Sequence, residues 1–153
     1  KANHEIEWWS VFDNPLPYLN PENYPSDMAV GLEEKIKQSD AIIVASPVYH
    51  LSISGALKNT LDHTDYTIFK GKKIGLVCNS ASSYSTGTVF SHLRDIIAEM
   101  RGICVAAYVG TIQKDYKKNE DGSFTLESKS VKKRLMKMVK QLEVIDVSEL
   151  KED

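Results

Sequence analysis

The sequence predicts a single α/β domain, spanning residues 1–153, in which helices cover both faces of a parallel sheet. Three stretches, 41–46, 72–80 and 103–110, are apolar along nearly their whole length, which is typical of strands buried on both faces. Amphipathic stretches with helical spacing alternate with them. Alternation of strands and helices of these lengths indicates a three-layer sheet with right-handed crossovers.

The first part of the chain adds one strand and one helix before the first buried strand. Alternating apolar residues predict the strand at 4–12. The helical pattern of 25–38 starts after Ser26 or Asp27, either of which suits a helix cap. Its predicted apolar face consists of Ala29, Leu32 and Ile36. The loop between them, 13–25, is stiffened by prolines and holds four apolar side chains that the core or a partner must cover: Leu16, Tyr18, Leu19 and Tyr24.

The other helices follow the buried strands. Residues 54–64 predict a helix with Ser54 as its cap, and 86–101 predict a helix that Gly102 ends as C-terminal cap. The last helix is predicted at 127–145. We interpret its basic side chains as a solvated face rather than a binding surface: Lys129, Lys132, Lys133, Arg134, Lys137 and Lys140.

Composition excludes several classes of function. With 19 Lys and Arg against 21 Asp and Glu, the chain has no positive field that would attract nucleic acid or anionic lipid. No apolar stretch approaches the roughly 20 residues that span a bilayer, and no signal-peptide pattern opens the chain, so we expect a cytoplasmic protein without membrane contact. Cys78 and Cys104 lie in predicted strands without metal-ligand or CxxC spacing, which favours core thiols over a disulfide, a metal site or a redox pair.

The loop after the first buried strand is the strongest candidate for a binding site, because ligands of such sheets bind beyond the carboxyl ends of the strands. Pro47 cannot donate to a strand ladder and should end the pairing. We expect this to leave the amides of Val48, Tyr49 and His50 free for a ligand, and Gly55 to permit close backbone approach. The same features also suit an ordinary loop with a capped helix.

The order of residues in this region is more specific. The stretch SDAIIVASPVYHLSISGALKNTLDH, residues 39–63, resembles the strand–loop–helix signature of the NADPH-dependent FMN reductase family, flavodoxin-like flavoproteins that include quinone and azo reductases. Weaker similarity extends over most of the chain. The matching positions are Asp40, Ser46, Pro47, Tyr49, Ser52, Gly55, Leu57, Lys58, Asn59, Leu61 and Asp62.

The resemblance implies an FMN-dependent enzyme that passes hydride from NADPH or NADH to FMN and then reduces a quinone, an azo compound, free flavin or a similar acceptor. The alternative is a flavodoxin-like flavin-binding or electron-carrier module without nicotinamide turnover. The implied FMN-binding residues are Pro47, Val48, Tyr49 and His50 after one strand, and Ser80, Ala81 and Ser82 after the next. His50 as a proton donor, and Tyr84 as a cover for the ring or a subunit contact, stay open.

The resemblance also implies features beyond the site. Relatives open with a strand and a Gly-Ser-x-Arg-x-x-Ser loop that holds the flavin phosphate, and neither is found here. That strand is central in the order 2-1-3-4-5, so we expect an N-terminally incomplete domain lacking about thirty residues. We also expect a homodimer or homotetramer, with the 13–25 loop and the 54–64 helix at the interface. Lys58 and Asp62 pair along that helix or across the interface.

Overall fold

Three parallel strands form the central sheet of the structure, a computed structural model that describes residues 4–23, 27–81 and 86–144. The strands are β1 (Ala41–Pro47), β2 (Lys73–Ser80) and β3 (Ile103–Ile112), in the order β1-β2-β3. The predicted α/β class and parallel sheet are confirmed. The three strands follow one another as the last three of the predicted order, and the full order 2-1-3-4-5 stays a prediction.

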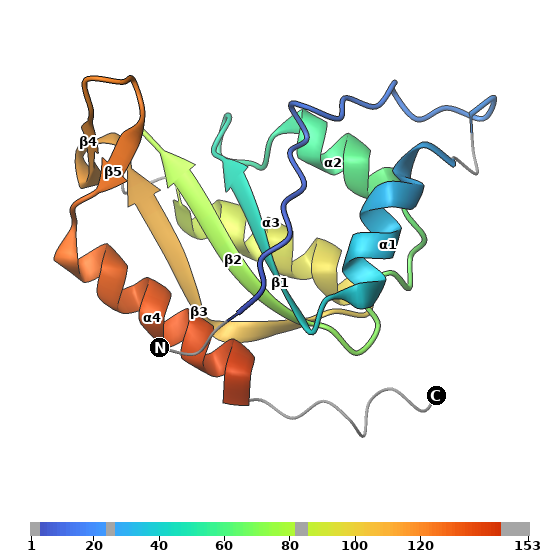
Figure 1. Cartoon of the computed structure of the whole chain (residues 1–153). Coiled ribbons are helices and arrows are strands. Elements are labelled where there is room, and N and C mark those ends of the chain that lie inside the picture. Colours follow the sequence, from blue (N-terminus) through green and yellow to red (C-terminus); the bar gives the residue numbers. More distant parts are fainter. Residues whose placement is uncertain (1–3, 24–26, 82–85, 145–153) are drawn as a thin grey trace.

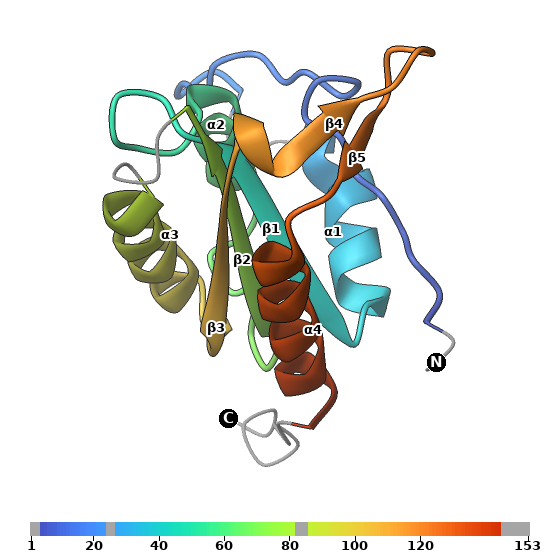
Figure 2. The same cartoon turned by 90° about the vertical axis from the view of Figure 1, so that its left-hand side faces the viewer.

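Four helices surround this sheet within the described residues: α1 (Val30–Gln38), α2 (Gly55–Asp62), α3 (Thr86–Glu99) and α4 (Lys129–Val144). Figure 2 shows α3 and α4 on opposite faces of the sheet. Between β3 and α4 the chain forms a short antiparallel hairpin, β4 (Tyr116–Lys118) and β5 (Phe124–Leu126), which projects beyond the carboxyl end of β3 (Figure 1). Short 3-10 helices occupy Asp27–Ala29 and Gln113–Asp115.

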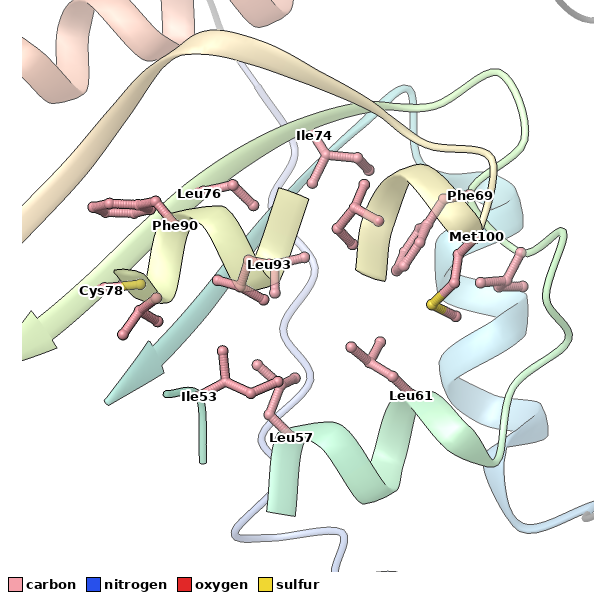
Figure 3. Packing of buried hydrophobic residues seen from close by; sticks show 14 of the residues in the cluster. Ile53, Leu57, Leu61, Phe69, Ile74, Leu76, Cys78, Phe90, Leu93 and Met100 are labelled. Carbon is pink, nitrogen blue, oxygen red and sulfur yellow. The ribbon is translucent and has the colours of Figure 1, made fainter. Parts of the chain in front are cut away.

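The core has one part on each side of the sheet. The larger part joins the sheet to α1, α2 and α3, and Figure 3 shows its side chains from α2, α3 and the strands pointing toward one another. The smaller part joins β3 to α4 through Val105, Val109, Val131, Met138 and Leu142. The basic side chains on the outer side of α4 are exposed, in keeping with a solvated face.

The predicted strand at 4–12 is wrong. Residues 4–10 form no strand, and Ile6 and Trp8 point largely into solvent. Trp9 instead packs on α1, where its ring lies 3.3 Å from the position that a Cβ on Gly31 would take. The alternation did not bury the apolar side chains of Ile6 and Trp8, because a strand also requires a neighbour with free ladder groups. β1 is therefore an edge strand of the described sheet.

A bulge distorts β3 in its first half. Ile74 pairs with Cys104, yet Leu76 pairs with Tyr108, so β3 uses four residues where β2 uses two. Arg94 of α3 donates to the carbonyl of Val105 at 3.2 Å, and Gln141 of α4 accepts from the amide of Ala107 at 2.7 Å. Helices on both sides of the sheet thus satisfy the backbone groups that the bulge removes from the ladder.

Two predicted helix ends also differ. Asp27 does not cap α1, since it begins the 3-10 helix and α1 follows Ala29, which offers no side-chain hydrogen bond; Ser26 lies outside the described residues. At the end of α3 the left-handed residue is Arg101, with φ of 64°, rather than Gly102.

Candidate functional site

The two loops predicted to form the site leave neighbouring strand ends. Pro47, the last residue of β1, is in register with Asn79 near the end of β2. The amide of Val48 then donates to the carbonyl of Asn79 at 2.8 Å, which ties the first loop to the second strand. Figure 1 shows both strands ending at the same edge of the sheet. The predicted neighbourhood of the two loops is therefore present.

The first loop contains a tight two-residue turn. Tyr49 and Ser52 exchange both backbone hydrogen bonds at 3.0 Å, and the two residues between them have positive φ, 49° for His50 and 63° for Leu51. Positive φ at both central positions is characteristic of a type I′ turn, which favours Asn and Gly. Neither is present here, so side chains with a Cβ occupy strained positions.

This turn corrects the prediction that three amides would be free. Val48 donates to Asn79 and Tyr49 donates to Ser52, so both amides are bonded within the chain. The amide of His50, at the tip of the turn, donates no hydrogen bond to any described residue. Pro47 ends the strand as predicted, but the chain turns back on itself and uses two of the three donors.

Serine side chains fix the return of this loop into α2. Ser54 caps the helix as predicted, because its Oγ accepts from the amide of Leu57 at 3.2 Å. The buried Ser46 hydroxyl accepts from the amide of Ser54 at 3.0 Å and donates to the Pro47 carbonyl at 2.8 Å. An added Cβ at Gly55 would meet no atom of the chain within 4 Å, so no close approach within the chain itself requires glycine there. The first turn of α2 therefore borders open space.

A contact that the sequence did not reveal joins the turn to α3. Ser52 Oγ and His92 Nδ1 lie 3.2 Å apart, at hydrogen-bond distance. Neither residue shows a local sequence signal for this pairing, because they are forty residues apart and meet only once the two loops have brought α3 beside the turn. His92 faces solvent on the outer side of α3.

The predicted site residues differ in exposure. Pro47 and His50 are exposed, Tyr49 keeps 60% of its surface and Val48 is half-buried. In the second loop Ala81 is exposed, whereas Ser80 is 4% exposed, so its hydroxyl reaches solvent far less. Ser82 and Tyr84 lie outside the described residues.

Among the described residues, no group of three His, Cys, Asp or Glu side chains is arranged to hold a metal ion. Cys78 is fully buried and Cys104 partly buried, and both are free thiols. No helix in the described ranges has the length and apolar character to cross a membrane.

The family model for NADPH-dependent FMN reductases matches residues 1–117 of this chain. The chain belongs to this family. Among its relatives is the FMN-dependent NADPH-azoreductase of Staphylococcus aureus strain USA300, which is 40% identical over 111 residues. This match covers 72% of the chain and 58% of the relative, so the chain spans less than two thirds of the relative's length.

Solved structures show that the chain has a flavodoxin-like fold. It resembles an NADH:FMN oxidoreductase in its apo form with a TM-score of 0.68 at 18% identity, covering 93% of this chain and 73% of that one. It also resembles a flavodoxin, WrbA-like protein from Agrobacterium tumefaciens with a TM-score of 0.55 at 17% identity, covering 77% and 72%. Identities this low establish the fold alone.

The described loops fit part of an FMN molecule. The unbonded amide of His50, the exposed ring of Tyr49 and the open space at Gly55 lie along the loop after β1 and the start of α2, at the carboxyl edge where ligands of such sheets bind. These groups suit the flat ring system of a flavin, which needs apolar cover and a few fixed donors. The sequence contains no Gly-Ser-x-Arg-x-x-Ser loop, so we assign no residue to the phosphate.

Proposed function

We propose that the protein is an FMN-dependent NAD(P)H oxidoreductase that reduces a small-molecule acceptor such as a quinone, an azo compound or free flavin. The observation that carries the proposal is the pair of neighbouring loops at the carboxyl ends of β1 and β2, in a chain 40% identical to an FMN-dependent NADPH-azoreductase. Bound FMN would supply a ring that accepts a hydride from the nicotinamide and returns two electrons to the acceptor.

The chain's own residues would bind and orient the ring. We assign Pro47, Val48, Tyr49 and His50 to one side of the ring and Ser80, Ala81 and Ser82 to its pyrimidine edge. The amide of His50, which donates no hydrogen bond to any described residue, is one donor that the first loop can offer to the ring. A fixed amide stabilises negative charge without reorganising, which favours the reduced state of a bound flavin. No catalytic side chain is required, and a proton-donating role for His50 stays open.

Spectroscopy tests this proposal directly. The purified protein is titrated with FMN while the flavin fluorescence is followed, and NADPH is then added under argon. We expect saturable quenching, followed by bleaching of the flavin absorbance and its return on addition of an acceptor. Quenching without bleaching by NADPH or NADH would identify a flavin-binding or electron-carrier module instead. The absence of quenching would contradict both the oxidoreductase and the flavin-binding module.

Assembly and location belong to the same proposal. We propose a homodimer or homotetramer, supported by Tyr18, which is 86% exposed in the loop between the first segment and α1. Leu16 and Leu19 of that loop are half-buried by the chain itself, and Tyr24 lies outside the described residues. Sedimentation at micromolar concentration would contradict the proposal if the FMN-loaded protein were monomeric.

Because nicotinamide co-substrates are cytoplasmic metabolites, we also propose a cytoplasmic location.

A further inference from the structure

The hydrogen bond between Ser52 and His92 joins α3 to a turn with two positive-φ residues at the edge of the candidate site. We propose that Ser52 and His92 are positioning residues that fix the 49–52 turn, and that this turn selects planar aromatic electron acceptors. The inference rests on the proposed function, since it concerns which acceptors that site takes. It assigns a role to two residues that need not touch the flavin.

The turn requires external support because its backbone is unfavourable for its residues. His50 and Leu51 both have positive φ, a conformation that residues with a Cβ adopt at a cost. Such backbone persists only where surrounding contacts over-determine it, and it is concentrated at functional sites. Without support, a loop of this sequence would relax toward conformations with negative φ.

The support comes from few contacts. The turn closes through its own backbone bonds between Tyr49 and Ser52, and its base is tied to β2 by the bond from Val48 to Asn79. Among the described residues, Ser52 to His92 is the one side-chain hydrogen bond that ties the turn to α3. Ser52 closes the turn and also carries this bond, so losing the bond removes the tie to α3 and leaves only the backbone bonds to hold the turn.

The tip itself presents the selective surface. Tyr49 is 60% exposed, Leu51 is 53% exposed and His50 is exposed between them. These side chains place an aromatic ring and an aliphatic group at the carboxyl edge, next to the loop that leaves β2. A rim of this kind stabilises a flat aromatic acceptor through area burial and ring stacking, whereas a small hydrated ion gains little from it.

Amide hydrogen exchange tests whether the contact holds the turn, and it does not depend on turnover. In Ser52→Ala and in His92→Ala we expect the amides of Tyr49 and Ser52, which bond across the turn, to exchange about three- to tenfold faster, the factor that one net hydrogen bond represents. His92→Asn keeps a side-chain polar group near the position of Nδ1 and should restore slow exchange. Ser91→Ala is the matched control, because Ser91 is exposed on α3 and bonds only within its own helix, to the Gly87 carbonyl.

Kinetics then test selectivity with the FMN-loaded protein. Menadione serves as the planar aromatic acceptor and ferricyanide as the small one that does not stack. In both alanine variants we expect the KM for menadione to rise about three- to tenfold, with the KM for ferricyanide unchanged. The double variant should raise the KM for menadione no more than either single variant does, because both substitutions remove the same contact.

The outcomes separate this inference from the proposed function. A protein that fails to bind FMN or to be bleached overturns the proposed function, and the exchange rates still report on the turn. Unchanged exchange in His92→Ala overturns the positioning role while leaving the proposed function intact; this variant is at an exposed helix position and should fold. Faster exchange with equal effects on both acceptors overturns the selective role of the turn.

Discussion

The side-chain amide of Asn59 donates a hydrogen bond to the carbonyl of Pro17 at 2.9 Å. The same nitrogen reaches the Leu16 carbonyl at 3.2 Å, and Oδ1 accepts from the amide of Leu19 at 3.0 Å. One turn further along α2, the buried His63 places Nε2 2.8 Å from the same Pro17 carbonyl. Asn59 in α2 and His63, the residue that caps the carboxyl end of α2, therefore both bind a loop that is more than forty residues away in sequence.

These hydrogen bonds give Asn59, one of the residues that match the family signature, a structural role that does not involve the flavin. Asn59 supplies the donors and acceptor that a neighbouring strand would otherwise offer to the loop. Because a carbonyl can only accept, the Nε2 of His63 carries the hydrogen. The apolar residues Leu16 and Leu19 are turned partly inward as a result.

Replacing Asn59 tests this interpretation. Asn59→Ala removes three hydrogen bonds to main-chain groups, so we expect the free energy of unfolding to fall by about 2–3 kcal/mol. Urea unfolding measures the change. The control is Lys58→Ala on the same helix, which removes an exposed ion pair with Asp62 and should change stability by less than about 0.5 kcal/mol. Equal effects of the two substitutions would contradict the assignment.

The strained turn gives a second prediction, in the stabilising direction. Leu51 has a φ of 63°, so Leu51→Gly should raise the free energy of unfolding by about 1 kcal/mol. Leu51→Ala is the matched comparison, because alanine also shortens the exposed side chain but retains the Cβ that makes this conformation costly. Thermal unfolding of both variants separates the two effects. A gain in the alanine variant as large as that in the glycine variant would exclude backbone strain as the cause.

Much of the fold was predictable because apolar patterning and helix signals are local. The three buried strands, the helices after them and the Ser54 cap follow from the residues within each element. The segment 4–12 shows the limit of this reasoning, since its alternation is real but its pairing depends on a neighbouring strand. An alternating pattern alone does not bury its apolar side chains, because both burial and strand formation depend on a neighbouring strand.

The candidate site shows a similar division. The ends of β1 and β2 were predictable from Pro47 and the apolar runs. The conformation of the loop was not, because a type I′ turn is normally signalled by Asn or Gly and here contains His50 and Leu51. The bonded amides of Val48 and Tyr49 follow from that hidden turn. The contact of Ser52 with His92 depends on tertiary packing and has no local signal.

Alkaline pH should destabilise the protein through a buried thiol. Burial raises the pKa of the Cys78 thiol from 9.0 to about 12, so the unfolded thiol ionises first as the pH rises. The stabilising contribution is complete below pH 9 and is lost between pH 9 and pH 12. Cys104 contributes in the same direction, because burial also raises the pKa of its thiol.

Urea unfolding at pH 8 and pH 10 measures this effect. Between these values we expect the wild-type protein to lose about 1.4 kcal/mol more than Cys78→Ala does. The change in the free energy of unfolding between the two pH values is compared for the two proteins. Other groups that titrate in this range contribute equally to both changes, and the lower stability of the variant cancels because it is present at both pH values. Equal changes in the two proteins would show that Cys78 is accessible to ionisation in the folded protein. Thiol reagents at pH 8 should likewise label Cys78 only after unfolding.

At the end of α3, substitutions at the adjacent residues Arg101 and Gly102 should change the stability of the protein in opposite directions. The amide of Gly102 donates to the Ile97 carbonyl at 2.8 Å and that of Arg101 donates to the Ala98 carbonyl at 3.0 Å, the bonds of a Schellman motif. The left-handed position of this motif usually holds glycine, but here it holds Arg101. Gly102 is required for space, since an added Cβ would lie 2.6 Å from Ile97 Cγ2 and 2.9 Å from Phe69 Cβ.

We therefore expect Gly102→Ala to lower the free energy of unfolding by about 1–3 kcal/mol, because the two core side chains must shift. Arg101→Gly should raise it by about 0.5 kcal/mol, since relief of the backbone outweighs loss of the contact between the guanidinium and the Tyr66 ring, 5.9 Å away. Arg101→Ala loses that contact without relieving the backbone, so it should be less stable than Arg101→Gly by about 1 kcal/mol. Thermal unfolding of the three variants measures these differences. If Arg101→Ala and Arg101→Gly were equally stable, the strain at Arg101 would be negligible and the motif would owe its geometry to Gly102 alone.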